Sequence, residues 1–209
     1  MAGVVAALWA AAWVMGAAPA RAQAQEQAPT HRTRAPGHSF LSGLPPASLG
    51  GPCLRSGNAF LRARIRGAVR ADVDLHGAAL RCEGGARHDG SGIRMGFEGR
   101  VRRIGRVRMI FGIDGARAGR AGRELPTNLT VFFEDEKLLF ATQGDSNCTV
   151  DRLTQEPVGG SRAVKARAYR IVAHGFCIAP VNDIAGRRRI VVTTFDFAGR
   201  ADFNTPNTP

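Results

Sequence analysis

Three side chains of the types used in hydrolytic catalysis lie close to two cysteines in the second half of the chain. Ser146 and Asp151 flank Cys148, and His174 precedes Cys177 by three residues. A serine nucleophile, a histidine base and an orienting acid are the groups that acyl transfer requires. The surrounding residues form no G-x-S-x-G elbow, no H-E-x-x-H sequence and no glycine-rich phosphate loop. We therefore retain Ser146, His174 and Asp151 as catalytic candidates that no motif supports.

Two further groups of side chains have the chemistry of cation ligands. His76, Cys82 and His88 are near one another in the sequence, but neither a C-x-x-C nor an H-x-x-x-H spacing supports zinc binding by them. The acidic run at residues 134–136 falls between two apolar segments, and consecutive side chains at such a hairpin tip diverge instead of converging on an ion. We expect neither a metal nor a cofactor.

The start of the chain indicates the compartment. An apolar run from Val4 to about Ala18 is followed by Ala20-Arg21-Ala22, which is the small-x-small pattern of a cleaved secretory signal. The run is shorter than the roughly 20 apolar residues that span a bilayer, and no later segment is apolar enough. We expect a signal peptide at residues 1–22, export to the periplasm or the extracellular space, and no transmembrane anchor.

In an oxidising compartment, the four cysteines are expected to form disulfides. Cys53, Cys82, Cys148 and Cys177 allow three pairings. Each sequential pair brackets a hairpin-like segment, so we favour Cys53 with Cys82 and Cys148 with Cys177. In the chain-entropy model, closing a loop of about 30 residues contributes roughly 3 to 4 kcal/mol.

The mature chain divides into a leader, one domain and a tail. Residues 23–50 are rich in Pro, Gln and Ala without an apolar period and predict a flexible leader, and residues 204–209 predict a disordered tail. Residues 51–203 are enough for a single core. There, short apolar alternation is punctuated by glycine, and no convincing amphipathic helix is found. We predict an all-β domain, an antiparallel β-sandwich or partly closed β-barrel of about 8–10 short strands, stapled by disulfides.

Individual strands follow from the same alternation, and the turns from small polar residues. Asp89-Gly90 suits a tight hairpin turn, Asp145 and Asn147 are expected to be turn formers, and Cys148 restarts a strand. The remaining strands are expected within residues 59–67, 71–77, 78–99, 106–114, 128–143, 169–177 and 188–199, most of whose phenylalanines should fill the core.

The aromatic content argues against two classes of binding protein. Both tryptophans, Trp9 and Trp13, lie in the predicted signal, and Tyr169 is the single tyrosine. Sugar-binding platforms and grooves for single-stranded nucleic acid rely on exposed Trp and Tyr for stacking. Carbohydrate recognition is therefore disfavoured, and we expect no sequence-specific binding of nucleic acid.

Arginine dominates the charge of the chain, which has 27 Arg, 2 Lys and a formal net charge of +12. This imbalance, with abundant Ala and Gly, is typical of GC-rich bacterial codon usage, but it also favours contact with anionic partners. The arginines are spaced by apolar residues and glycines, as on the solvated face of strands. A candidate anion-binding surface comprises Arg100, Arg102, Arg103, Arg106, Arg108, Arg187, Arg188 and Arg189.

These observations favour a secreted or periplasmic β-domain that has a non-catalytic binding or structural role in the envelope. The partner is not identified by the sequence. One alternative is a small exported hydrolase that uses the catalytic candidates named above. A second alternative is a basic module that attaches to an anionic component of the envelope surface or to a polyanion.

Overall fold

The structure of the protein is a computed structural model, which describes residues 53–54, 57–158 and 168–203. The signal peptide, leader and tail predicted from the sequence lie outside these residues. Eleven strands are present: β1 (Phe60–Gly67), β2 (Ala71–His76), β3 (Arg81–Ala86), β4 (Gly92–Val101), β5 (Gly105–Asp114), β6 (Gly122–Phe133), β7 (Leu138–Ala141), β8 (Cys148–Pro157), β9 (Ala168–Cys177), β10 (Val181–Asp183) and β11 (Arg189–Asp202).

The predicted all-β fold is confirmed. Among the described residues, the helical content is a single 3-10 turn, η1 (Gly77–Ala79), between β2 and β3. The eleven strands exceed the eight to ten that we expected, and β10 is the strand that the sequence did not predict. Its three residues are too few to display an alternation in the sequence. No helix in the part of the chain that the structure covers is long and apolar enough to cross a membrane.

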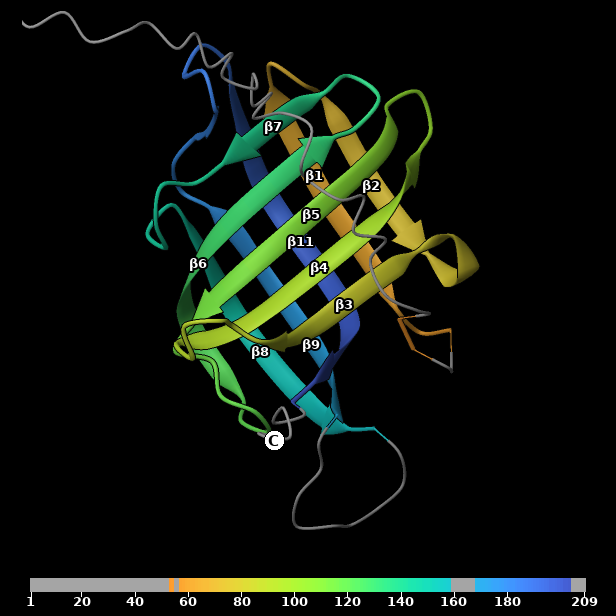
Figure 1. The fold of residues 1–209 in the computed structure, drawn as a ribbon, viewed down its shortest axis with the longest axis vertical. Helices are drawn as coiled ribbons and strands as arrows, with labels where there is room; N and C mark the ends of the chain where they lie inside the picture. Colours follow the sequence, from red (N-terminus) through yellow and green to blue (C-terminus); the bar gives the residue numbers. More distant parts are fainter. Residues whose placement is uncertain (1–52, 55–56, 159–167, 204–209) are drawn as a thin grey trace, which may run out of the picture. The chain divides into compact units, whose positions relative to one another are not determined.

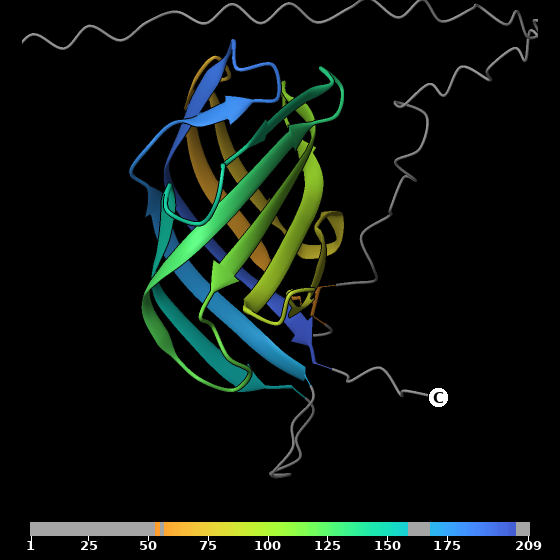
Figure 2. The same ribbon diagram turned by 60° about the vertical axis from the view of Figure 1, so that its left-hand side comes forward.

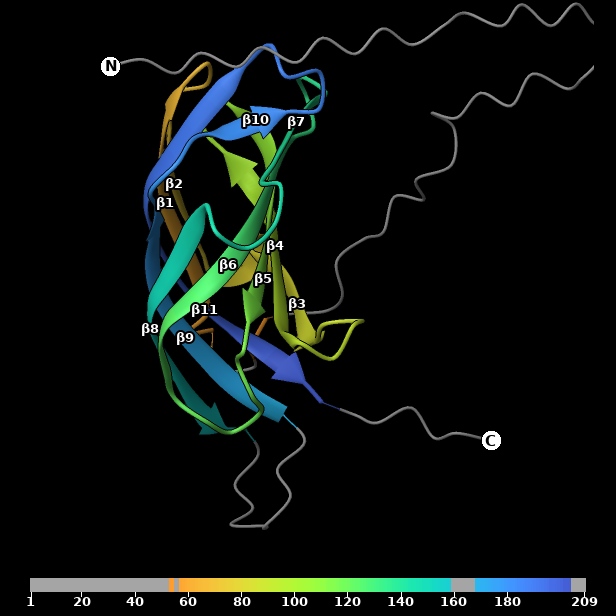
Figure 3. The same cartoon turned by 90° about the vertical axis from the view of Figure 1, so that its left-hand side faces the viewer.

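The strands form one antiparallel sheet that folds back on itself into two facing layers (Figure 1). Along the hydrogen-bonded path the order is β2-β1-β11-β10-β7-β6-β5-β4-β3. In Figure 1, β3 to β6 lie in front of β1, β2, β9 and β11, and Figure 3 presents the two layers from the side. Side chains alternate along each strand, so one row enters the core between the layers and the other faces outward.

One side of this arrangement is closed by strand pairing, which makes it a partly closed barrel. Between β6 and β11, β7 pairs with β10 at one level and β8 pairs with β9 at the other. Both β7 and β8 pair with β6, and both β9 and β10 pair with β11. Cys148, the first residue of β8, faces Cys177, the last of β9, and the two form a disulfide. The predicted staple thus lies where the two levels meet.

Phenylalanine rings join the two layers of the core. The ring of Phe197 on β11 lies 5.0 Å from that of Phe97 on β4 and 4.8 Å from that of Phe111 on β5, measured between centroids. All three side chains are fully buried. Burial of each such side chain contributes roughly 1.5–3 kcal/mol. Of the phenylalanines in the expected strands, three are exceptions. Phe60 and Phe132 are half-buried, and Phe176 is 37% exposed.

A glycine makes room for another of these rings. Gly175 on β9 lies directly opposite Phe195 on β11. A Cβ atom at Gly175 would overlap the Phe195 ring and the carbonyl oxygen of Thr149 on β8. The absence of a side chain at this position therefore allows the ring to lie against β9, where it is fully buried.

Candidate functional site

Outward-facing arginines on β5 are paired with acids from the neighbouring strands. Glu98 on β4 is only 4% exposed, and its carboxylate accepts hydrogen bonds from Arg106 Nη1 at 3.2 Å and Arg108 Nη2 at 2.8 Å. Both guanidinium groups also approach Glu134, at N···O distances of 3.5 and 3.3 Å. A carboxylate withdrawn from water in this way requires charged partners. Arg106 and Arg108 therefore neutralise Glu98 and Glu134.

A second ladder of ion pairs covers the outer face of β1 and β2. Arg62 lies 3.3 Å from Asp74, and Arg64 and Arg66 lie 3.8 and 2.8 Å from Asp72. The pairs follow the antiparallel register, which places Arg62 opposite Asp74 and Arg64 opposite Asp72. Because these side chains are largely exposed, each pair contributes only about 0–1 kcal/mol to stability, but it compensates the charge of its arginine locally.

The arginines of the predicted anion-binding surface are only partly paired with acids. Arg100, in the predicted anion-binding surface, pairs with Asp135 at 3.5 Å, as Arg106 and Arg108 pair with Glu98. Eleven exposed arginines have no carboxylate within ion-pair distance among the described residues. Five of them are Arg81 on β3, Arg117 and Arg120 in the β5–β6 turn, Arg123 on β6 and Arg152 on β8. We call the other six the turn arginines. They are Arg70 in the β1–β2 turn, Arg102 and Arg103 in the β4–β5 turn, and Arg187, Arg188 and Arg189 in and just after the β10–β11 turn.

The turns that carry these arginines lie at one end of the sheet, which we call the upper end (Figures 1 and 2). The amide of Ala68 donates to the carbonyl of Arg189 at 2.9 Å, which joins the β1–β2 and β10–β11 turns. The amide of Ile184 donates to Leu139 at 3.3 Å, which joins the β10–β11 turn to β7. The β6–β7 turn completes the end and contacts the β4–β5 hairpin through the Arg100–Asp135 ion pair. The turn arginines are therefore gathered on neighbouring hairpin tips.

An open depression of about 180 Å³ lies on the outer face of the front layer. It is lined by Ala79, Arg81, Glu98, Gly99, Arg100 and Arg106. None of these side chains is a serine, cysteine, histidine or tyrosine nucleophile, and the carboxylate among them is already held by two arginines. The depression therefore has the chemistry of a charged surface and lacks the nucleophile and free base of an acyl-transfer site.

The structure places the three catalytic candidates on the outer surface without assembling them. His174 on β9 lies 2.6 Å from Asp196 on β11, measured from Nδ1 to Oδ1, and both side chains are about half exposed. Ser146 is exposed in the loop before β8, and Asp151 is exposed at a β-bulge in β8. In the described part of the chain, no hydrogen bond joins Ser146 or Asp151 to the imidazole of His174. The acid that orients His174 is Asp196, which the sequence analysis did not select.

All four cysteines are bonded in the predicted pairs, Cys53 with Cys82 and Cys148 with Cys177. The thiol of Cys82 is consequently not free to ligate a metal beside His76 and His88. Within the described ranges, no group of three or more His, Cys, Asp or Glu side chains is arranged to hold a metal ion.

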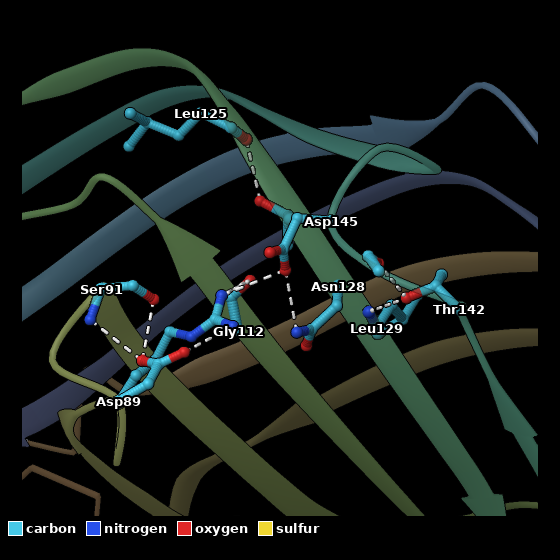
Figure 4. Close-up of polar contacts among 11 residues, drawn as sticks. Asp89, Ser91, Gly112, Leu125, Asn128, Leu129, Thr142 and Asp145 are labelled. Carbon is cyan, nitrogen blue, oxygen red and sulfur yellow. Dashed lines mark hydrogen bonds and ion pairs between the residues drawn. The ribbon is translucent and has the colours of Figure 1, made fainter.

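The loop between β7 and β8, residues 142–147, is packed against β6 (Figure 4). The carbonyl of Asp145 accepts a hydrogen bond from the Thr127 amide at 2.8 Å, and its carboxylate accepts from Asn128 Nδ2 at 2.9 Å and Arg87 Nη1 at 3.1 Å. Partial burial disfavours the charge of Arg87, but the hydrogen bond and charge of Asp145 outweigh it and raise the pKa of the guanidinium. Asp145, expected as a turn former, thus also ties this loop to the β3–β4 turn.

Comparisons of the chain with protein-family models, with curated proteins and with solved structures gave no match. The function must therefore be inferred from the arrangement of the side chains described above.

Proposed function

We propose that the protein is an exported β-domain that acts by binding and attaches to an anionic component of the cell envelope through the turn arginines. The observation that carries this proposal is the contrast between two sets of arginines. Those on the faces of β1 and β5 are paired with carboxylates, whereas the turn arginines, like five other exposed arginines, are not paired among the described residues. The turn arginines are the six that share the upper end of the sheet.

Uncompensated guanidinium groups on neighbouring turns produce a local positive potential, which attracts anions and accelerates their encounter with the protein. The planar guanidinium also binds phosphate or carboxylate oxygens through two parallel hydrogen bonds. Since the turns are held by a continuous sheet, little conformational freedom is lost on binding. Export is supported by the secretory pattern of residues 1–22 and by two disulfides, which persist in oxidising compartments.

The proposal is tested with immobilised heparin as the polyanion and with two triple variants of the mature protein. One variant carries R187Q, R188Q and R189Q. The matched control carries R62Q, R64Q and R66Q, which removes the same formal charge from arginines that are paired with Asp72 and Asp74. We expect the turn variant to elute at clearly lower salt than the wild type, and the control to elute close to the wild type.

Circular dichroism verifies that both variants are folded before the elution is compared. Equal losses of retention in the two variants would mean that only net charge matters, and they would overturn the proposed site. Retention of the wild type that does not weaken as salt rises would overturn the electrostatic basis of the proposal.

A further inference from the structure

We infer that the anionic partner is a bilayer surface rich in anionic phospholipids, and that the upper end docks on it with Ile184 inserted among the headgroups. This inference rests on the proposed function, because the same turn arginines supply the charge. It adds a partner of defined chemistry and an apolar contact that a soluble polyanion does not need.

Ile184 is the feature that favours a bilayer. It lies in the β10–β11 turn, three residues before Arg187, and 78% of its surface is exposed. This is the largest exposure among the large hydrophobic side chains that the structure describes. A sulfated or phosphorylated chain offers no apolar environment to such a side chain, whereas the boundary between headgroups and acyl chains buries apolar residues flanked by arginines.

The turn that presents Ile184 is held in a defined conformation. Asp183 Oδ1 accepts hydrogen bonds from the amides of Arg187 and Arg188 at 2.8 and 3.1 Å, and the carbonyl of Asp183 accepts from Gly186 at 2.9 Å. Gly186 has φ of +68°, a conformation that favours glycine. The apolar side chain and the arginines that follow it are therefore presented together, without a cost for ordering the turn.

The neighbouring turns are compatible with the approach of an anionic surface. Arg70 lies on the β1–β2 turn, which is hydrogen-bonded to the β10–β11 turn, and Arg102 and Arg103 lie on the β4–β5 turn at the same end (Figure 3). The acidic β6–β7 turn lies among them, but ion pairs with arginines compensate Glu134 and Asp135.

Two further acids, Glu136 and Asp183, lie in or beside the turns of the upper end. Glu136 is exposed next to Lys137 in the β6–β7 turn, so their charges offset one another. Asp183 directs a carboxylate oxygen at the backbone amides of its own turn. The charge that this end presents to a surface is therefore positive, and each arginine close to an anionic bilayer is expected to raise the partition coefficient about fivefold.

The test is co-sedimentation of the mature protein with vesicles of phosphatidylglycerol and phosphatidylcholine, and with vesicles of phosphatidylcholine alone. The variant is I184S. The matched control is I178S, because Ile178 is 70% exposed but follows β9 and lies outside the arginine-bearing turn. We expect binding to the mixed vesicles only, a loss of about tenfold in the partition coefficient for I184S, and no change for I178S. Retention of I184S on heparin should equal that of the wild type.

The outcomes separate this inference from the proposed function. Retention of the wild type on heparin without binding to phosphatidylglycerol vesicles would overturn the lipid partner and leave the proposed attachment site standing. If the wild type bound neither heparin nor phosphatidylglycerol vesicles, both the lipid partner and the proposed attachment site would be overturned. Equal loss of vesicle binding in I184S and I178S, or no loss in I184S, would overturn the insertion of Ile184.

Discussion

Removal of the disulfide at the start of β8 tests how the barrel is closed. In the double variant C148A/C177A, the unfolded chain loses the constraint of a bond between residues separated by 29 positions. The chain-entropy relation gives a stabilisation of about 3.6 kcal/mol at 25 °C for a loop of this length. For a domain of this size, that loss corresponds to a fall in Tm of roughly 7–14 °C. The β8–β9 ladder remains paired without the bond, so we expect a folded but less stable protein.

The second disulfide provides a matched comparison, because Cys53 and Cys82 are also separated by 29 positions. The variant C53A/C82A should lose a similar free energy of unfolding, since the entropic contribution depends on loop length. Urea unfolding under non-oxidising conditions measures the free energy of unfolding of both variants. Far-ultraviolet circular dichroism is a better signal for it than fluorescence, because both tryptophans precede residue 23. A loss below about 1 kcal/mol for C148A/C177A would refute the reasoning that this bond constrains the unfolded chain.

Further substitutions test the packing, the ion pairs and a turn. Gly175→Ala should lower the free energy of unfolding by about 1–3 kcal/mol, because the new Cβ overlaps an aromatic ring and a carbonyl oxygen. Gly186→Ala, where φ is +68° but the space is open, should lower the free energy of unfolding by about 1 kcal/mol. If urea unfolding showed a larger loss for Gly186→Ala than for Gly175→Ala, the packing argument would be contradicted. Glu98→Gln should cost about 1–3 kcal/mol, because two arginines lose a buried anionic partner, and an unchanged urea midpoint would count against this. Hydrogen bonds from a backbone amide and a hydroxyl in its own turn lower the pKa of Asp89 below its ordinary 3.8. The ionised Asp89 carboxylate therefore contributes to stability above pH 3.8, and this contribution is lost as the pH falls through its lowered pKa. Asp89→Asn should reduce the difference in stability between pH 7 and pH 2 that urea titrations measure.

The strands and the disulfide pairing could be predicted from the sequence because both depend on short-range patterns. β1 from Leu61 to Arg66 and β2 from Ala71 to His76 alternate apolar residues with charged residues or histidine, and the two cysteine pairs bracket similar hairpin segments. β10 could not be predicted, since its three residues are too few to show an alternation and are also held by pairing with β7, which lies far away in the sequence.

The partners of the charged side chains could not be predicted, because they depend on register between strands. Asp196 meets His174 only through the β9–β11 pairing, across 22 residues of sequence. Glu98 could be placed opposite Arg108 within one hairpin, but Glu134, which shares Arg106 and Arg108 with it, comes from the β6–β7 turn. The predicted anion-binding surface therefore contained paired and unpaired arginines, which composition cannot distinguish.

The most direct measurement is the salt concentration at which the two triple arginine variants elute from heparin. If the upper end is the attachment site, the variant of Arg187, Arg188 and Arg189 elutes at clearly lower salt than the wild type. The variant of residues 62, 64 and 66 then elutes at nearly the same salt concentration as the wild type. Identical elution of the two variants would contradict the assignment of binding to the upper end, since both remove three positive charges from a folded domain.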